Sequence, residues 1–264
     1  MVATTVRATV YTVTRVWKQA TTMYLSGRPE WPSLDMSLVP RKITAMILNT
    51  DLKVRSWTDP PPRLAYLNVR SGVIDDPKEL PLSLRVLTIG SIGCPTRMES
   101  LIYLPEGIRN LTLYLTPEGN CDLRGIPRSV RSLSLWNYNG SLGDIPDYVT
   151  TLRLFESRRQ TIGDELPRDL SSLTIFGHEH LEVIEALPIG LYDLSITFCP
   201  ELASCGFPAM LNSLKLSHVS LDLELPQLLV LESLSLGQLL ATNGYEIGPS
   251  EDAIPEYHEI WSLS

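Results

Sequence analysis

Hydrophobic and polar positions along this chain recur in one frame about every 21 residues. Each frame opens with a proline, and apolar residues follow it at the third, sixth and eighth positions. Nine prolines open such frames: Pro40, Pro61, Pro81, Pro105, Pro127, Pro146, Pro167, Pro188 and Pro208. All 27 apolar slots are filled, although only 44% of the chain is apolar, so the periodicity is a true internal repeat.

The last part of each frame predicts a short β-strand. In residues 133–135 and 194–196, apolar residues alternate with a small polar one, which is the period of a half-buried strand. The segments between strands are too short, and too rich in Gly, Pro, Asp and Asn, for a helix-backed unit of about 30 residues. The frame therefore predicts parallel strands stacked about 4.8 Å apart, joined by short 3₁₀ or extended returns, with little α-helix.

Weaker versions of the frame extend the repeat at both ends. They contain Ala20, Met23 and Leu25 upstream, and Leu231, Leu234 and Leu236 downstream. We therefore expect about eleven coils in a single solenoid over residues 17–240. Residues 1–16 predict an N-terminal cap or arm, and residues 241–264 an acidic C-terminal tail.

The frame P-x-x-L-x-x-L-x-[LIV] resembles the leucine-rich repeat family, and residues 166–175 (LPRDLSSLTI) match it well. It is most similar to the short proline-containing classes, the bacterial-effector-type repeats and the FNIP-type repeats of amoebae and giant viruses. The resemblance implies a leucine-rich-repeat solenoid with a curved parallel β-sheet on its concave face. It also implies that a ligand would bind on that face.

One departure from the family pattern concerns the inside of each coil. The family's usual asparagine, three residues after the last leucine of the strand, is missing. The slot holds Gly72, Ile92, Thr116, Tyr138, Ser157, His178, Cys199 and Val219. We therefore expect the return turns to satisfy their backbone polar groups in other ways.

Aromatic residues occupy one strand column in four consecutive coils. The position after the last leucine holds Tyr114, Trp136, Phe155 and Phe176, and none of the other seven coils has an aromatic there. Strands about 4.8 Å apart would place these rings in a stripe roughly 15 Å long. Exposed, contiguous aromatic surface is typical of a binding site. The alternative is a structural ladder covered by the C-terminal tail or by loops.

The columns beside this stripe are small and polar. Most residues of these two columns carry a hydroxyl group. Arg153 interrupts one column, and Asn110 is the first residue of the other. Such a surface suits the edge of a peptide or protein. We therefore predict a partner-binding site at Tyr114, Trp136, Phe155, Phe176, Arg153 and Asn110.

Composition and motifs exclude several classes of function. The chain has 22 Lys and Arg against 30 Asp and Glu, a net charge of −8, which argues against nucleic acid as the main partner. It has no apolar run long enough to span a membrane. The four cysteines and four histidines form no metal-ligand spacing or nucleophile–base pattern, and no nucleotide-binding glycine motif is present. We expect no enzyme activity, no cofactor and no metal site.

The sequence favours an intracellular, cytoplasmic protein. Its first residues lack the continuous apolar core of a secretory signal. Mitochondrial import is the alternative, because the chain has no acidic residue before Glu30. The leading functional hypothesis is a non-catalytic protein–protein interaction module that binds a partner on its concave face. The alternative is a structural subunit of a large multi-protein or viral assembly, with association through the terminal segments.

Overall fold

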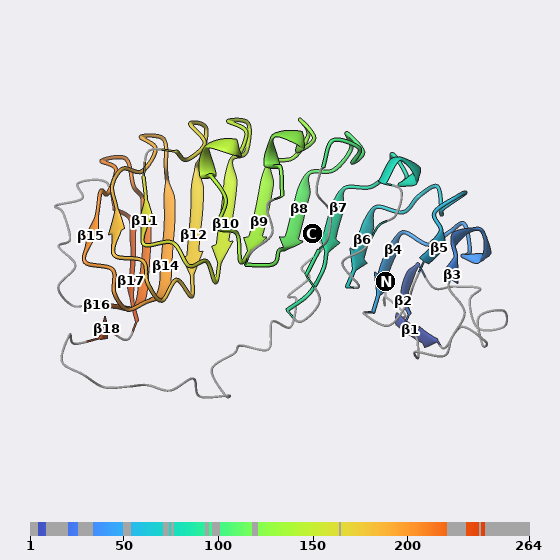
Figure 1. Ribbon diagram of the computed structural model, residues 1–264, viewed down its shortest axis with the longest axis horizontal. Helices are drawn as coiled ribbons and strands as arrows, with labels where there is room; N and C mark the ends of the chain where they lie inside the picture. Colours follow the sequence, from blue (N-terminus) through green and yellow to red (C-terminus); the bar gives the residue numbers. More distant parts are fainter. Residues whose placement is uncertain are drawn as a thin grey trace.

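The structure, a computed structural model, describes residues 5–8, 21–25, 34–49, 54–70, 74, 77–92, 95–96, 101–117, 121–163, 165–220, 231–237 and 239–240. One sheet of 13 strands runs through the described part of the chain (Figure 1). Its parallel strands are arranged in chain order along an arc. They are β1 (Thr5–Ala8), β2 (Thr22–Leu25), β4 (Ala45–Leu48), β6 (Tyr66–Val69), β7 (Val86–Ile89), β8 (Asn110–Tyr114), β9 (Ser132–Trp136), β10 (Thr151–Phe155), β12 (Ser172–Phe176), β14 (Asp193–Cys199), β16 (Ser213–Ser220) and β17 (Ser233–Leu236), with β18 (Leu239–Leu240) beside β16.

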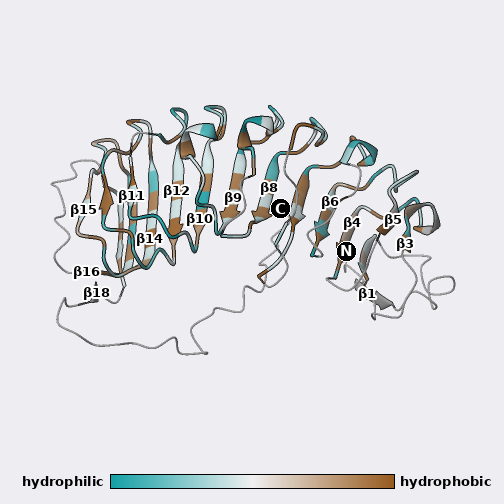
Figure 2. Ribbon diagram, in the orientation of Figure 1, coloured by the Kyte–Doolittle hydropathy of each residue, from teal (hydrophilic) through white to brown (hydrophobic). Residues whose placement is uncertain are grey.

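The strands pair in the register that the repeat predicts. Leu133, Leu152 and Leu173 are direct partners on β9, β10 and β12, and the same slots pair in the other repeats. The hydrophobic positions accordingly recur from strand to strand (Figure 2). All 27 slot residues are at most 2% exposed, and Leu154 is the most exposed of them. The core of the molecule is therefore the repeat itself, stacked coil on coil.

The recurring proline forms a hydrogen-bonded corner before each strand. In all nine frames its carbonyl oxygen accepts a bond from the backbone N–H three residues later, as from Val149 to Pro146 at 3.1 Å. The proline contributes an acceptor to this corner and needs no donor of its own. The residue that donates is an apolar slot residue, which the corner directs into the core. This geometry explains why proline and the apolar residue three positions later recur together.

The return segments are short, as predicted. Several contain a single turn of 3₁₀-helix: η2 (Met36–Leu38), η3 (Pro77–Glu79), η4 (Leu123–Gly125) and η5 (Leu142–Asp144). In later coils the returns are extended and pair as a second parallel sheet of β11 (Thr161–Ile162), β13 (Val183–Ile184) and β15 (Ser204–Cys205). Strands β3 (Leu34–Asp35) and β5 (Val54–Ser56) form a third sheet. No α-helix occurs in the described residues, which confirms the predicted fold class.

The number of coils differs slightly from the prediction. All eleven predicted strands are present, but the regular proline corner occurs only in the nine central frames. In the weaker downstream frame, Leu234 and Leu236 are 51% and 47% exposed, because β17 follows β16 at the end of the sheet order. The complete coils are therefore fewer than the eleven that the pattern predicts.

The predicted terminal segments lie mostly outside the described residues. Within the segment 1–16, residues 5–8 form β1, which pairs in parallel with β2 of the same chain. The segment 241–264 lies wholly outside the described residues. The division into cap, solenoid and tail stays a prediction.

The inner slot that usually holds asparagine is filled by residues that satisfy the turn in different ways. The Tyr138 hydroxyl donates to the carbonyl of Ser141 at 2.8 Å, and the Ser157 hydroxyl accepts from the backbone N–H of Arg159 at 3.3 Å. His178 Nδ1 lies 3.1 Å from the carbonyl oxygen of Phe176. Tyr138, Ser157 and His178 are at most 5% exposed, whereas Ile92 in the same slot is 62% exposed. Each turn therefore has its own local solution in place of an asparagine ladder.

Candidate functional site

The face of the large sheet that points away from the core is lined mainly by small polar side chains. We call it the open face, and its central column is the residue between the two inward-pointing apolar residues of each strand. From β7 to β16 this column reads Thr88, Thr112, Ser134, Arg153, Thr174, Ser195 and Lys215. None of these side chains makes a hydrogen bond or ion pair within the described part of the chain. The hydroxyl, guanidinium and ammonium groups of this column are therefore available to hydrogen-bond a ligand.

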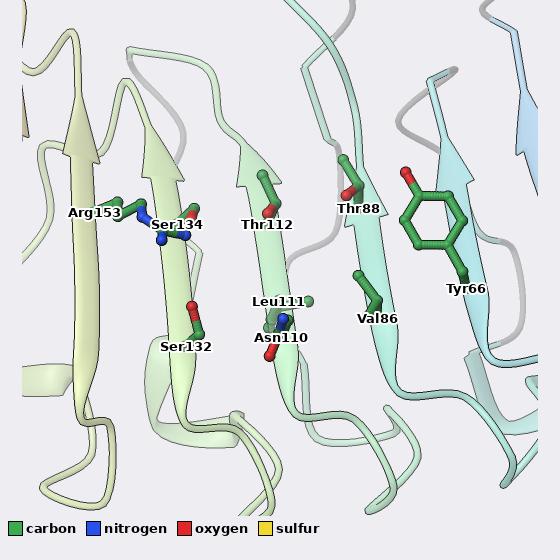
Figure 3. Close-up of a pocket in the computed structure, with 9 residues that line it drawn as sticks. All are labelled: Tyr66, Val86, Thr88, Asn110, Leu111, Thr112, Ser132, Ser134 and Arg153. Atoms are coloured by element: carbon green, nitrogen blue, oxygen red, sulfur yellow. The ribbon is translucent and has the colours of Figure 1, made fainter. Parts of the chain in front are cut away.

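A hollow of about 190 Å³ lies on the open face over β6 to β10 (Figure 3). It is lined by Tyr66, Val86, Thr88, Asn110, Leu111, Thr112, Ser132, Ser134 and Arg153. Arg153 extends from β10 toward Ser134, which brings its guanidinium over the neighbouring strand (Figure 3). The sheet is therefore concave here, and a cation and several hydroxyls share the depression. Two of the six predicted site residues, Asn110 and Arg153, line this hollow.

The four predicted aromatic residues stack along the edge of the same face. The ring centroids of Tyr114 and Trp136 are 5.0 Å apart and those of Trp136 and Phe155 are 4.3 Å apart, with nearly parallel planes. Phe155 and Phe176 follow at 6.1 Å with tilted planes. The aromatic column thus forms a continuous stack, each ring carried by one strand.

The middle of this stack is less exposed than a binding stripe would be. Trp136 and Phe155 are only 9% and 8% exposed, because the flat face of each is covered by its neighbours. Tyr114 and Phe176 at the two ends are half-buried. Stacked aromatic pairs stabilise a fold beyond their buried area. The geometry therefore gives the two central rings a structural role, and it leaves the accessible polar groups in the columns beside them.

The stack continues beyond the four residues that the sequence predicts. Phe198 lies 5.3 Å from Phe176, and His218 stacks on Phe198 at 4.1 Å. In the repeat register the expected residues here are Thr197 and Ser217. We call the six residues Tyr114, Trp136, Phe155, Phe176, Phe198 and His218 the ring ladder.

A row of left-handed backbone conformations explains the two extra rings. In five consecutive coils the residue after the aromatic column has a positive φ between 53° and 71°. These residues are Asn137, Glu156, Gly177, Phe198 and His218. A left-handed residue breaks the alternation of the strand, so two successive side chains lie on one side. Gly177 and Asn137 are residue types that favour this conformation, but Phe198 and His218 carry no such sequence signal.

Burial shifts the pKa of several cysteines and of one histidine in the described coils. Burial raises the pKa of Cys121 to about 11 and of Cys199 and Cys205 to about 12, so these thiols stay protonated at neutral pH. Burial lowers the pKa of His178 to about 4. The Ser217 hydroxyl lies 2.9 Å from His218 Nδ1, but the two residues are neighbours in the chain and no described carboxylate orients the ring. Cys94 lies outside the described residues.

The described residues also lack a metal-binding cluster and a membrane-spanning helix. No group of three or more His, Cys, Asp and Glu side chains gathers there in a way that could hold an ion. None of the described helices has the length and apolar content that crossing a membrane requires.

Comparison with known proteins finds chains of similar fold among solved structures. No protein-family model matches the chain, and no curated protein is detectably similar to it. Among solved structures, CroV588, described as a novel circular LRR protein, is 16% identical with a TM-score of 0.46; the alignment covers 84% of this chain and 45% of CroV588. The leucine-rich repeat-containing protein LegL7 from Legionella pneumophila is 14% identical with a TM-score of 0.42, over 94% of both chains.

The chain therefore spans less than half the length of CroV588. The assignment depends on the chain's own features, which are the proline frame, the buried leucine slots and the single file of parallel strands. These features identify the chain as a repeat protein of the leucine-rich-repeat type.

Proposed function

We propose that this chain is a non-catalytic module that binds a protein partner on the concave, open face of its sheet. The fold class generally mediates protein–protein interaction, because a solenoid presents an extended concave surface. One observation supports this site: the side chains of the central column, from β7 to β16, have no hydrogen-bond partner within the described residues. Polar groups that have no partner among the described residues can bond a partner's backbone and side chains at little cost to the fold.

The arrangement fits an edge or loop of a protein better than a small molecule. The hollow is shallow and mainly polar, and the surface extends over many strands. Small-molecule sites are typically deeper and more apolar. Two half-buried members of the ring ladder, Tyr114 and Phe176, would add apolar contact beside the polar column.

Affinity capture from native cells with quantitative mass spectrometry tests this proposal. Thr112→Trp and Thr174→Trp place bulk on the open face, where both wild-type side chains are half-buried. Ala209→Trp, at an exposed turn, is the matched control. We expect the open-face variants to lose at least one protein that wild type and Ala209→Trp retain, with unchanged circular dichroism. An unchanged protein list for all variants would contradict the proposal.

A second candidate function is a structural subunit of a larger assembly. It is favoured by exposed apolar side chains in the last coils, with Ile189 at 82%, Met210 at 60% and Leu234 at 51%. Large exposed apolar surface marks association sites. Sedimentation of the same purified chain separates the two functions, since a binding module should remain monomeric at concentrations where a subunit self-associates.

We also propose that the chain acts inside the cell. Cys121, Cys199 and Cys205 are all free, which suits a reducing compartment. Fractionation that recovers the protein outside the cell or in mitochondria would contradict a cytoplasmic location.

A further inference from the structure

Three arginines form a row at the edge of the open face. Arg85, Arg109 and Arg131 occupy the same slot, just before β7, β8 and β9. Because neighbouring strands are about 4.8 Å apart, the row is about 10 Å long. All three side chains are exposed, and none forms an ion pair within the described residues. Three like charges at this spacing repel one another.

Most hydrogen-bond donors of this row are available to a ligand. Arg85 uses Nη1 to donate to three carbonyl oxygens of the adjacent turns at 3.1 to 3.2 Å. Arg131 uses Nη1 in the same way, with a shortest distance of 2.7 Å. Arg109 makes no such bond within the described coils. A guanidinium has five N–H donors, so the bonds to the turns orient Arg85 and Arg131 while leaving donors free.

The row lies next to the polar hollow of the open face. The residues that directly follow the three arginines are Val86, Asn110 and Ser132, and all three line the hollow. Arg153 lines the same hollow from β10 (Figure 3). Arg153 therefore shares the depression with the hydroxyls of Thr88, Thr112, Ser132 and Ser134, and the arginine row follows its edge where β7, β8 and β9 begin. Guanidinium and hydroxyl donors together are suited to carboxylates.

We propose that this hollow and its arginine row bind an acidic, extended segment of the protein partner. The inference rests on the proposed function and names the chemistry of the partner. Charge complementarity supports it, because this surface is locally cationic on a chain of net charge −8. A nucleic acid fits less well, since it needs a basic face over many phosphates. In an extended segment, alternate side chains lie on one side about 6.7 Å apart, so two or three carboxylates can meet the row.

A fluorescein-labelled ten-residue peptide with glutamate at three alternate positions tests the inference by fluorescence anisotropy on the full chain. A peptide with glutamine at the same positions is the ligand control. Arg109→Gln and Arg153→Gln remove one charge each from side chains without partners in the described structure. Arg168→Gln is the matched control, because Arg168 is an exposed arginine on a turn away from the hollow.

We expect each of Arg109→Gln and Arg153→Gln to weaken binding of the glutamate peptide about two- to fivefold, and Arg168→Gln to change it less than this. Binding should also weaken as salt is raised. Equal binding of the glutamine peptide, or an equal loss in Arg168→Gln, would overturn the inference. A third result would also overturn the inference: the peptide binds only after the acidic residues of the C-terminal segment are all neutralised. The occupant would then be the chain's own segment that contains Glu246, Glu251, Asp252, Glu256 and Glu259.

The capture experiment distinguishes the failure of this inference from the failure of the proposed function. If bulk at Thr112 and Thr174 abolishes capture but Arg109→Gln and Arg153→Gln do not, the open face binds a partner that is not recognised through acidic groups. If neither set of variants changes capture, the open face itself is not the binding site.

Discussion

Single residues inside the coils show how this chain departs from the usual leucine-rich repeat. At the slot where the family has asparagine, His178 is fully buried, and its Nδ1 lies 3.1 Å from the carbonyl oxygen of Phe176. Its Nε2 is buried with no partner in the described residues, as is Nε of Arg159. A buried, neutral imidazole is compatible with this turn, whereas a buried imidazolium is costly.

The first prediction concerns the pH dependence of stability at His178. Burial is the main cause that lowers its pKa from 6.5 to about 4, so the unfolded chain binds a proton more readily than the folded chain. The contribution to stability is fully present above pH 6.5 and declines as the pH falls toward 4, by about 3 kcal/mol. Urea unfolding at pH 7 and at pH 4.5 should show that His178→Asn loses less stability on acidification than wild type.

His180→Gln is the control for that measurement. His180 is exposed and its Nδ1 lies 3.3 Å from Glu201 Oε2, so its replacement tests the effect of removing a histidine from the surface. If His178→Asn and His180→Gln have the same pH dependence as wild type, the buried imidazole does not titrate as the structure implies.

At the scale of elements, the strand ends are shaped by the ring ladder and the left-handed row together. Each positive-φ residue ends the alternation of its strand and directs the next side chain into the core, as at Glu156 and Ser157. Its backbone N–H still donates to the following coil, from Glu156 to Phe176 at 2.9 Å. The coils therefore stay hydrogen-bonded while the chain turns, and the rings cover the edge of the sheet.

The second prediction concerns the structural contribution of this ladder. Trp136→Ala removes a ring that stacks on both Tyr114 and Phe155 and is 9% exposed. We expect it to lower the free energy of unfolding by about 2–4 kcal/mol in urea titrations followed by circular dichroism. Trp136→Phe keeps a ring in the stack and should cost less than about 1.5 kcal/mol. Equal stability of Trp136→Ala and wild type would show that the ladder is not structural.

At the scale of the whole molecule, the solenoid is a one-dimensional stack. Each strand of the large sheet pairs only with strands of the preceding and following coils. The free energy of unfolding is therefore a sum of the stability of each coil and of its interfaces with the neighbouring coils. How much a residue contributes depends on where its coil lies along the stack. Charge, in contrast, does not repeat from coil to coil. The chain is acidic overall, yet the arginine row makes one part of the open face basic.

The third prediction compares one repeat slot in the middle and at the end of the stack. Leu152 on β10 is fully buried, while Leu234 on β17 occupies the same slot and is 51% exposed. We expect Leu152→Ala to lower the free energy of unfolding by about 2–5 kcal/mol and Leu234→Ala by less than about 1 kcal/mol. Similar losses in urea titrations of the two variants would mean that the end of the stack is as well packed as its centre.

Much of the candidate site could be predicted by aligning the chain on its own repeat. The columns of the open face, the stacking of Tyr114, Trp136, Phe155 and Phe176, and the slot shared by Arg85, Arg109 and Arg131 all follow from register. The row of arginines was missed although its spacing was available in the sequence. Phe198 and His218 could not be found in this way, because left-handed residues shift them out of the expected column.

The fold of this protein follows from its internal repeat alone. Its apolar slots recur at fixed distances after proline, and burying them requires that successive short strands stack in one register. Which polar and aromatic side chains remain accessible is set by the packing of the coils in three dimensions. Accessibility depends on the curvature of the sheet, the overlap of rings from neighbouring strands and the backbone conformation at the strand ends. These arise from contacts between coils, which no single frame of the sequence contains.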